Sequence, residues 1–318
     1  MLLVVDVGNT QTHFGTWQDG ELIEHWRFAT VRESTADELG AALRSLLELR
    51  GVTLADLDAS IVSSTVPQLG LEWTAMASRY LSHEMLVVGP GIRTGMAIRY
   101  DNPREIGADR LVNAVAAFEK VGGPVVVVDF GTAITYDPVS AEGEYLGGII
   151  TPGVEISMEA LTSRAAALPR VEIAPPRSLI GKSTVDAIRS GIVYGFAGQV
   201  DAIVRRLRGE LGEETETIAT GGLAGHIVPF TETIDEVDDL LTLTGLKLLH
   251  ERNAGAVSAP PARAGYPRGR WRPRSPTPST SARSASRTAS CSRRWRASAT
   301  GSCACRPSAS VPGWRSAR

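Results

Sequence analysis

Residues 4–10 read Val-Val-Asp-Val-Gly-Asn-Thr, and residues 127–132 read Val-Val-Asp-Phe-Gly-Thr. The two stretches start 123 residues apart and share one pattern: a short apolar strand, an aspartate, an apolar residue, a glycine and a threonine, with Asn9 extra in the first. An internal repeat on this scale predicts two similar halves that face one another.

The repeated positions carry residue types that suit a phosphate site. They are Asp6 and Asp129, Gly8 and Gly131, and Thr10 and Thr132. Each glycine permits a tight turn and a close approach of backbone to ligand, and each threonine, with neighbouring backbone N–H groups, can bond phosphate oxygens. Each aspartate could hold a cation against those phosphates. Ordinary β-hairpins would explain one copy, but the repetition favours a phosphate clamp.

A third glycine element, Thr220-Gly221-Gly222, follows a predicted strand at Thr217–Ala219. Two glycines between a strand and a helix suit a flat ring or a ribose that lies close to the backbone. Because glycine pairs are common in turns, this element gains weight only as the third member of an ordered set.

The segments around these loops alternate between strand and helix patterns, which predicts an α/β fold. The predicted strands include Leu2–Val5, Val125–Val128 and a hairpin of Gln11–Trp17 and Glu21–Ala29 around Asp19-Gly20. The predicted helices include one after a capping box at Thr35–Glu38, Ile106–Lys120, a long helix over Val185–Leu207 and a closing helix over Asp238–Arg252.

Composition divides the 318-residue chain into a body, residues 1–255, and a tail, residues 256–318. The tail contains 13 Arg and no Lys, Asp or Glu, while the body contains 20 Lys and Arg against 35 Asp and Glu, so their net charges are about +13 and −15. All three cysteines lie in the tail. The body therefore offers no disulfide framework, no thiolate nucleophile and no cysteine zinc site.

The tail also lacks Leu, Ile, Phe and Met, so we expect it to be disordered because it cannot build a core. One explanation is a basic arm that binds nucleic acid. The other is GC-rich DNA translated out of frame, which yields Arg, Ala, Pro, Gly and Ser. The loss of acids and large aliphatics at one point favours the second, so we do not expect nucleic acid as a partner.

Six motifs occur in the order found in type III pantothenate kinases, which the body resembles. They are Asp6-Val-Gly-Asn-Thr10, Gly107-Ala-Asp-Arg110, Asp129-Phe-Gly-Thr-Ala133, Gly147-Gly-Ile-Ile-Thr-Pro-Gly153, Gly181-Lys-Ser-Thr184 and Thr220-Gly-Gly222. Gly-Ala-Asp-Arg is the most specific, whereas His13 stands where an aliphatic residue would be more familiar. The resemblance implies an α/β protein with two ribonuclease-H-like domains of the actin-like ATPase superfamily, at residues 1–121 and 122–255, followed by the tail at 256–318.

The same resemblance implies an activity: ATP-dependent phosphorylation of pantothenate to 4′-phosphopantothenate, the first step of coenzyme A biosynthesis. It implies ATP with Mg²⁺ and a monovalent cation, K⁺ or NH₄⁺. The implied ATP site is Asp6, Val7, Gly8, Asn9, Thr10, Gln11, Thr12, His13 and Thr132. The implied pantothenate site is Tyr100, Gly107, Ala108, Asp109, Arg110 and Thr184. Asp109 would be the catalytic base and Asp129 the ligand of the monovalent cation.

The residues alone support the role of Asp109 more weakly, because an acid in the first turn of a helix is favoured there anyway. A kinase needs a carboxylate to accept the hydroxyl proton as the phosphoryl group arrives. Arg110 could neutralise phosphate or the carboxylate of the substrate, or it could form a surface ion pair with Glu105.

Three glycines on the long helix, Gly191, Gly195 and Gly198, predict a close approach of another helix, and the resemblance implies a homodimer. The start of the chain does not resemble a signal peptide, and no apolar run approaches the roughly 18 residues of a membrane helix. We therefore expect a cytoplasmic protein with no membrane partner. The alternatives are another small-molecule kinase of the superfamily and a non-catalytic nucleotide-binding regulator.

Overall fold

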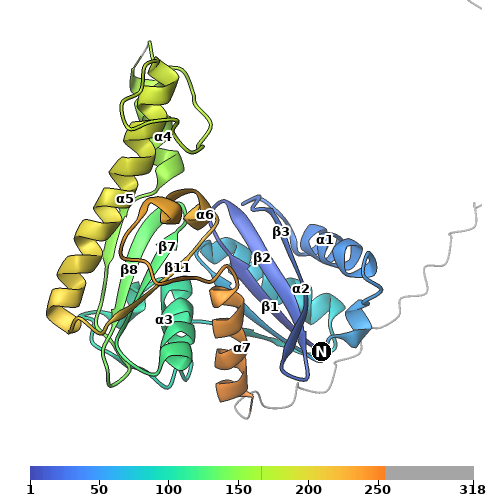
Figure 1. Ribbon diagram of the computed structural model, residues 1–318. Helices are drawn as coiled ribbons and strands as arrows, with labels where there is room; N and C mark the ends of the chain where they lie inside the picture. Colours follow the sequence, from blue (N-terminus) through green and yellow to red (C-terminus); the bar gives the residue numbers. More distant parts are fainter. Residues whose placement is uncertain (166, 255–318) are drawn as a thin grey trace, which may run out of the picture. The chain divides into compact units, whose positions relative to one another are not determined.

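The computed structural model describes residues 1–165 and 167–254 (Figure 1). The predicted disordered tail lies outside these residues. Two β-sheets form the framework, with strand orders β3-β2-β1-β4-β5 and β12-β11-β7-β8-β9-β6, and β10 pairs with β8. The strands are β1 (Leu2–Val7), β2 (Gln11–Gln18), β3 (Glu21–Ala29), β4 (Ala59–Ser64), β5 (Met85–Val87), β6 (Ala97–Ile98), β7 (Val125–Phe130), β8 (Ala133–Val139), β9 (Glu144–Tyr145), β10 (Ile149–Pro152), β11 (Glu216–Thr220) and β12 (Glu236–Val237).

The two sheets repeat one topology, which confirms the repeat predicted from the sequence. β1 pairs antiparallel with β2 and parallel with β4, and β7 pairs antiparallel with β8 and parallel with β11. The predicted hairpin forms as well, with Asp19 and Gly20 both at positive φ in the turn. The chain is an α/β protein of two ribonuclease-H-like halves, and each half begins with one copy of the repeated motif.

Helices cover both faces of each sheet. They are α1 (Ala36–Glu48), α2 (Pro67–Tyr80), α3 (Ala108–Val121), α4 (Val154–Arg164), α5 (Thr184–Leu211), α6 (Ala224–Ile227) and α7 (Leu241–Asn253), with 3-10 turns at Leu54–Asp56, Pro103–Glu105 and Val228–Phe230. The predicted capping box is present, since Glu38 N–H donates to Thr35 Oγ1 and the Glu38 carboxylate accepts from Thr35 N–H. In β1 the side chains alternate, so that Leu3, Val5 and Val7 pack under α1 and α2 while Val4 packs toward α3 and α7.

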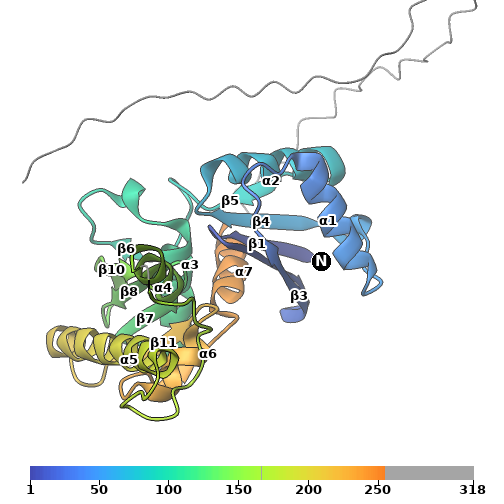
Figure 2. The ribbon, with the colours of Figure 1, turned by 90° about the horizontal axis from the view of Figure 1, so that it is seen from above.

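Helices α3 and α7 lie side by side between the two sheets (Figures 1 and 2). α3 packs on the second sheet through Ala114 and Ala117, whereas Leu243 and Leu246 of α7 pack toward the first. A Cβ on Gly245 of α7 would lie 2.3 Å from Val112 O of α3, so only glycine permits this approach. The two helices therefore join the halves, and the division at residues 121 and 122 stays a prediction.

Helix α4 and the start of α5 form an arm that projects away from both sheets (Figure 1). A Cβ on Gly191, Gly195 or Gly198 of α5 would meet nothing within 4 Å in the described chain. The helix contact that we predicted for these glycines is therefore absent from the described residues of a single chain.

Candidate active site

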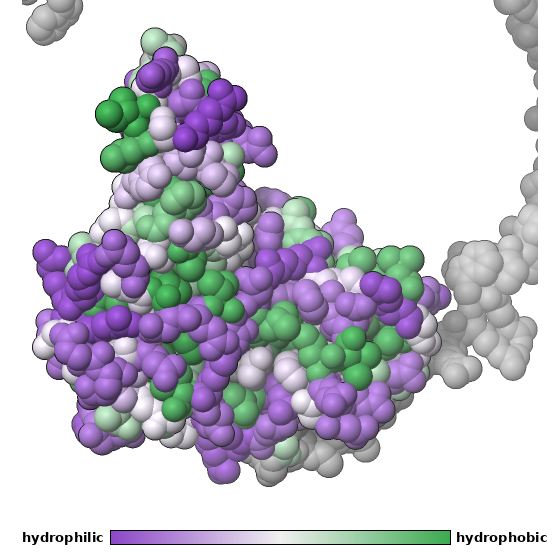
Figure 3. Space-filling model, in the orientation of Figure 1, coloured by the Kyte–Doolittle hydropathy of each residue, from purple (hydrophilic) through white to green (hydrophobic). Residues whose placement is uncertain are grey.

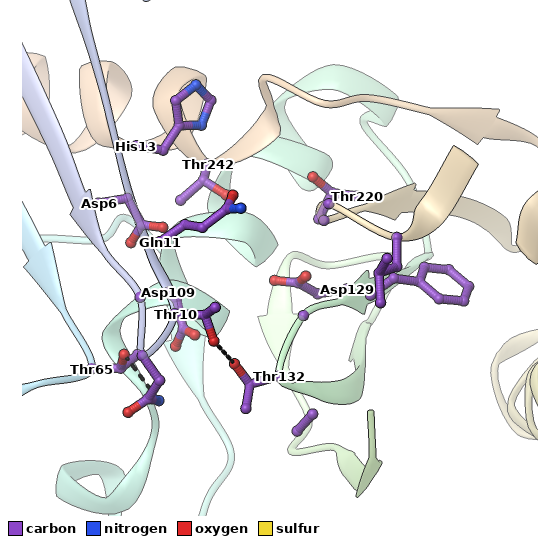
Figure 4. A pocket seen from close by; sticks show the side chains of 18 of the residues that line it. Asp6, Thr10, Gln11, His13, Thr65, Asp109, Asp129, Thr132, Thr220 and Thr242 are labelled. Carbon is purple, nitrogen blue, oxygen red and sulfur yellow. Dashed lines mark hydrogen bonds between the residues drawn. The ribbon is translucent and has the colours of Figure 1, made fainter. Parts of the chain in front are cut away.

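A cleft of about 300 Å³ lies where the first turns of the two sheets face one another (Figure 4). It is lined by the loop after β1, the loop after β7 and the glycines after β11. The hydroxyls of Thr10 and Thr132 meet across it, with 3.1 Å between their Oγ1 atoms. The two copies of the repeated motif thus form the two sides of one site.

The loop after β1 is shaped by Gly8. Its N–H donates to Gln11 O (3.0 Å), and a Cβ at this position would lie 2.9 Å from the same oxygen. Asn9 donates from Nδ2 to Thr65 Oγ1 (3.4 Å), and Thr65 donates to Val7 O (3.1 Å). The loop is therefore a narrow turn held by the neighbouring strand β4.

The loop after β7 is enclosed by two other glycines. A Cβ on Gly221 would lie 2.4 Å from Asp129 Oδ1, and one on Gly153 would lie 2.2 Å from Thr132 O. Gly221 therefore gives room to Asp129, and the ring or ribose contact that we predicted for this pair of glycines stays a prediction. Gly222 does have open space where its Cβ would be, and it lines the cleft.

Three of the carboxylates that line the cleft have a raised pKa: Asp6, Asp109 and Asp129. Burial and the charges of the other two raise the pKa of Asp6 to about 8. Burial and the charge of Asp109, with a smaller effect from Asp137, raise the pKa of Asp129 to about 7. Burial also raises the pKa of Asp109. Without a cation, this group of carboxylates favours protonation.

The residues of the cleft fit a cation that arrives with phosphate. Asp6 Oδ1 is buried and has no hydrogen-bond partner among the described residues. In the same part of the chain, no three His, Cys, Asp or Glu side chains converge closely enough to hold a metal ion alone. Mg²⁺ does not need such a group, because it keeps several waters and binds one or two carboxylates together with substrate phosphates.

Asp129 is oriented by a chain of hydrogen bonds from the central helices. Thr242 of α7 donates to Asn113 Oδ1 (2.7 Å), and Asn113 of α3 donates from Nδ2 to Asp129 Oδ2 (3.1 Å). Asn113 lies one turn after Asp109 on α3, so that one helix face contributes a carboxylate to the cleft and orients another.

Asp109 lies in the first turn of α3, as its motif predicts. Its Oδ1 accepts from the Arg110 N–H (2.9 Å), and a Cβ on Gly107 would lie 2.5 Å from the same oxygen. Gly107 therefore leaves room for the carboxylate at the helix start. Within residues 1–165 and 167–254, the other carboxylate oxygen makes no hydrogen bond that would prevent it from accepting a proton.

Arg110 points elsewhere. Its Nε and Nη2 lie 2.8 and 2.7 Å from Asp137 Oδ1 of β8, and both side chains are buried. Tyr145 donates to the same oxygen (2.7 Å) and Thr135 to Oδ2 (2.9 Å). A Cβ on Gly148 would lie 2.1 Å from Arg110 Nη2. This explains the second glycine of the motif at residues 147–153. The surface pair with Glu105, one of our two expectations for Arg110, is wrong.

The structure therefore brings together part of the predicted site. The predicted residues that line the cleft are Asp6, Gly8, Asn9, Thr10, Gln11, His13, Asp109, Asp129 and Thr132. Val7 and Thr12 pair in register on the opposite face of the first sheet and are buried there, because alternate residues of a strand face opposite sides. Tyr100, Gly107, Ala108, Arg110 and Thr184 are also outside the cleft lining.

Two of these outer residues form a second cluster beside Asp109. The Tyr100 ring lies next to Gly147 and 6.4 Å from the Tyr145 ring. Tyr145 in turn donates a hydrogen bond to Asp137, the ion-pair partner of Arg110. Thr184 is exposed at the start of α5, on the projecting arm.

The sequence patterns missed several residues of the cleft, namely Arg27, Thr65, Glu155, Asp239 and Thr242. Thr65 follows two serines at the end of β4, a hydroxyl-rich strand end that could have been noticed. Arg27 and Thr242 carry no local signal, because only the pairing of β3 and the packing of α7 bring them to the cleft.

The model of the type III pantothenate kinase family matches residues 2–206. The chain belongs to the type III pantothenate kinase family. The type III pantothenate kinase of Moorella thermoacetica is 51% identical over 253 residues, which cover 80% of this chain and 100% of that protein. The enzyme of the same name from Bacillus cytotoxicus is 51% identical over 254 residues, covering 80% of this chain and 97% of that protein.

Solved structures agree with the fold. A candidate 2-dehydro-3-deoxygalactonokinase from Sinorhizobium meliloti superposes with a TM-score of 0.50 at 12% identity, covering 79% of this chain and 98% of that one. The family membership confirms the resemblance drawn from the six motifs, and the fold is that of the actin-like ATPases. In the described residues, no helix has the length and apolar character needed to cross a membrane.

Proposed function

We propose that this protein transfers the γ-phosphoryl group of ATP to the terminal hydroxyl of pantothenate and so catalyses the first step of coenzyme A biosynthesis. The observation that carries the proposal is the cleft in which the two threonine hydroxyls meet beside Asp109. Family membership supports the same substrates.

The loops after β1 and β7 would bind the triphosphate through backbone N–H groups and the hydroxyls of Thr10 and Thr132. Asp109 would accept the proton of the attacking hydroxyl. Its raised pKa makes it a stronger base than an exposed aspartate. Mg²⁺, when bound with ATP, neutralises charge on the transferred group. The rest of the catalysis is positioning, since this chemistry needs no covalent intermediate on the enzyme.

A monovalent cation, K⁺ or NH₄⁺, would bind at Asp129. This carboxylate is oriented by Asn113 and lies near Asp6 and Asp109. Activity should therefore fall when potassium is replaced by sodium, and Asp129→Ala should weaken that dependence together with ATP affinity. Equal rates in both salts for both proteins would exclude this site.

The pantothenate site would lie beside Asp109, in the cluster around Tyr100 and Arg110. Asp137 holds Arg110 in this cluster, where its guanidinium would lie close to an anionic group of the substrate. Gly107 and Ala108 would contribute backbone at the start of α3.

We also propose a cytoplasmic homodimer formed through the arm of α4 and α5. On one side of the end of this arm, hydrophobic residues lie among hydrophilic ones (Figure 3). The exposed apolar residues of α4, of α5 and of the segment between them are Ile156, Leu161, Leu179, Ile180, Val185 and Tyr194. Bare glycines on α5 would allow a second copy to approach closely. Thr184 lies on the same arm, so its predicted contact with substrate would depend on this assembly.

Light scattering tests the dimer. Ile180→Asp should yield monomers, whereas Leu71→Asp, at an equally exposed leucine of α2, should leave the dimer intact. A monomeric wild-type protein would contradict the assembly.

The rival functions are another small-molecule kinase and a non-catalytic regulator. A panel of alcohol acceptors, each with ATP and Mg²⁺, separates the kinases, and we expect pantothenate to give the highest kcat/KM. DNA-binding assays with the full chain and with residues 1–253 test the regulator. Turnover of another acceptor in preference to pantothenate would overturn the proposed substrate.

A further inference from the structure

The charge of the cleft is unusual for a site that holds a triphosphate. Five carboxylates line it: Asp6, Asp109, Asp129, Glu155 and Asp239. Among the described residues of the lining, Arg27 is the one Lys or Arg side chain. A phosphoryl-transfer site needs positive charge around the phosphates, which kinases supply with Lys, Arg and metal ions. Arg27 therefore stands out as the protein's own positive charge.

Arg27 belongs to a row of side chains that runs across the first sheet. Asp6 of β1 pairs in register with His13 of β2, and His13 pairs with Arg27 of β3. Residues directly opposite one another on neighbouring strands share a face of the sheet, and all three line the cleft. Arg27 therefore projects on the same side as Asp6, about 10 Å away at two strand spacings.

Two groups lie next to Arg27, the backbone oxygen of Asp239 and the ring of His13, and neither neutralises its charge. Its Nη2 donates to the backbone oxygen of Asp239 over 3.4 Å, a long hydrogen bond to a neutral group. His13 lies between Arg27 and Asp6, and its half-buried ring is a neutral neighbour because desolvation, Arg27 and His25 lower the pKa of His13 to about 3. His13 bonds His25 instead (Nε2 to Nδ1, 3.1 Å).

We infer that the Arg27 guanidinium binds oxygens of the β- or γ-phosphate of the nucleotide in this cleft, an inference that rests on the proposed use of ATP. The planar guanidinium matches phosphate with two parallel hydrogen bonds, and binding would exchange the weak contact with Asp239 for charge-assisted ones. Arg27 is then a phosphate-binding residue that supplements the two threonine loops.

The competing role for Arg27 is a tether between β3 and the segment before α7. A tether would affect every nucleotide equally, whereas a phosphate contact discriminates between nucleotides by their phosphates. Calorimetric titration of the full chain with ATP–Mg²⁺ and with AMP, in the absence of any acceptor, separates the two roles. Charge-assisted hydrogen bonds predict a loss of ATP affinity of about 10- to 100-fold in Arg27→Gln, with AMP affinity unchanged.

Two further variants make the result decisive. Arg27→Lys keeps the charge but cannot make two parallel hydrogen bonds to one phosphate. The ATP affinity of this variant should therefore lie between those of wild type and Arg27→Gln. Arg44→Gln, at an exposed arginine that pairs with Glu48 on α1, should bind both nucleotides as wild type does. Unchanged ATP affinity in Arg27→Gln, or equal losses for ATP and AMP, would overturn the inference. A wild type that binds ATP but does not phosphorylate pantothenate would instead overturn the proposed function and leave Arg27 in place.

Discussion

Single residues in the cleft are arranged for a ligand at some cost to the unliganded protein. Burial and the charge of Asp109 raise the pKa of both Asp6 and Asp129, and Asp6 Oδ1 lacks a partner among the described residues. Such perturbed carboxylates in a cleft mark a functional site on physical grounds. The repulsion is relieved when cations bind, so the same residues that weaken the empty protein provide binding energy.

The pKa of Asp6 predicts a pH-dependent effect of Asp6→Asn on stability. Because folding raises this pKa to about 8 from 3.8, the folded protein holds a proton that the unfolded chain has released over this interval. The contribution of Asp6 to stability is therefore full below about pH 4 and is lost as the pH rises to about 8. In thermal melts without ligand, from about pH 5 to about pH 9, the melting temperature of Asp6→Asn should rise relative to that of wild type as the pH increases. A difference that stays constant with pH would contradict the assignment.

The buried pair of Arg110 and Asp137 predicts a large loss in Asp137→Asn. Removal of the charge leaves a buried guanidinium without its counter-ion, which costs about 3–5 kcal/mol of unfolding free energy. Tyr145→Phe removes one donor to Asp137 and should cost about 1 kcal/mol. Urea unfolding measures both, with Asp101→Asn as an exposed control. In Tyr145→Phe the KM for pantothenate should rise more than the KM for ATP, and equal changes would argue for a purely structural pair.

Secondary-structure elements near the repeated motif could be predicted from the sequence, because strand, turn and cap signals there are local. The hairpin at Asp19 and Gly20 and the capping box at Thr35 are confirmed. The closing helix was predicted from Asp238 but begins at Leu241, since Asp238 instead accepts from Lys120 and from Leu240 N–H before the helix.

The partner of Arg110 could not be predicted, because Asp137 lies on a strand 27 residues away. Arg27 reaches the cleft only through strand register.

The contact of α3 with α7 predicts that Gly245→Ala destabilises the protein. The added Cβ would overlap Val112 O, and α7 would have to move, at a cost of about 1–3 kcal/mol. Gly209→Ala on α5 is the matched control, because its Cβ would meet nothing within 4 Å and alanine has the higher helix propensity, by up to about 1 kcal/mol. Denaturant unfolding should therefore give opposite signs for the two variants. Similar losses in both would mean that helix packing does not set the requirement for glycine.

At the scale of the whole molecule, the described residues up to α7 contain both sheets, the cleft and the helices that join the halves. The Moorella thermoacetica enzyme is matched over its full length by 253 residues of this chain. This relative therefore has no counterpart of the basic tail.

Truncation after Asn253 should leave the melting temperature, solubility and turnover at the values of the full chain. Residue Asn253 closes α7 by donating to Leu249 O and Arg93 O, so the cut falls after the last of these contacts. Differential scanning calorimetry, the yield of soluble protein and the kinase assay check these three properties. An insoluble or inactive truncated protein would show that the tail belongs to the working molecule.

The most direct test of the proposed kinase is mass spectrometry of the product after incubation with ATP, Mg²⁺, K⁺ and pantothenate, for wild type and for Asp109→Asn. Asparagine keeps the size of the side chain and an oxygen that can accept from the Arg110 N–H, but it cannot accept the proton. We expect 4′-phosphopantothenate from the wild type and, with ATP affinity retained, turnover about 10²- to 10⁴-fold lower in the variant. No product from a wild type that binds ATP, or near-normal turnover in a stable Asp109→Asn, would contradict the account.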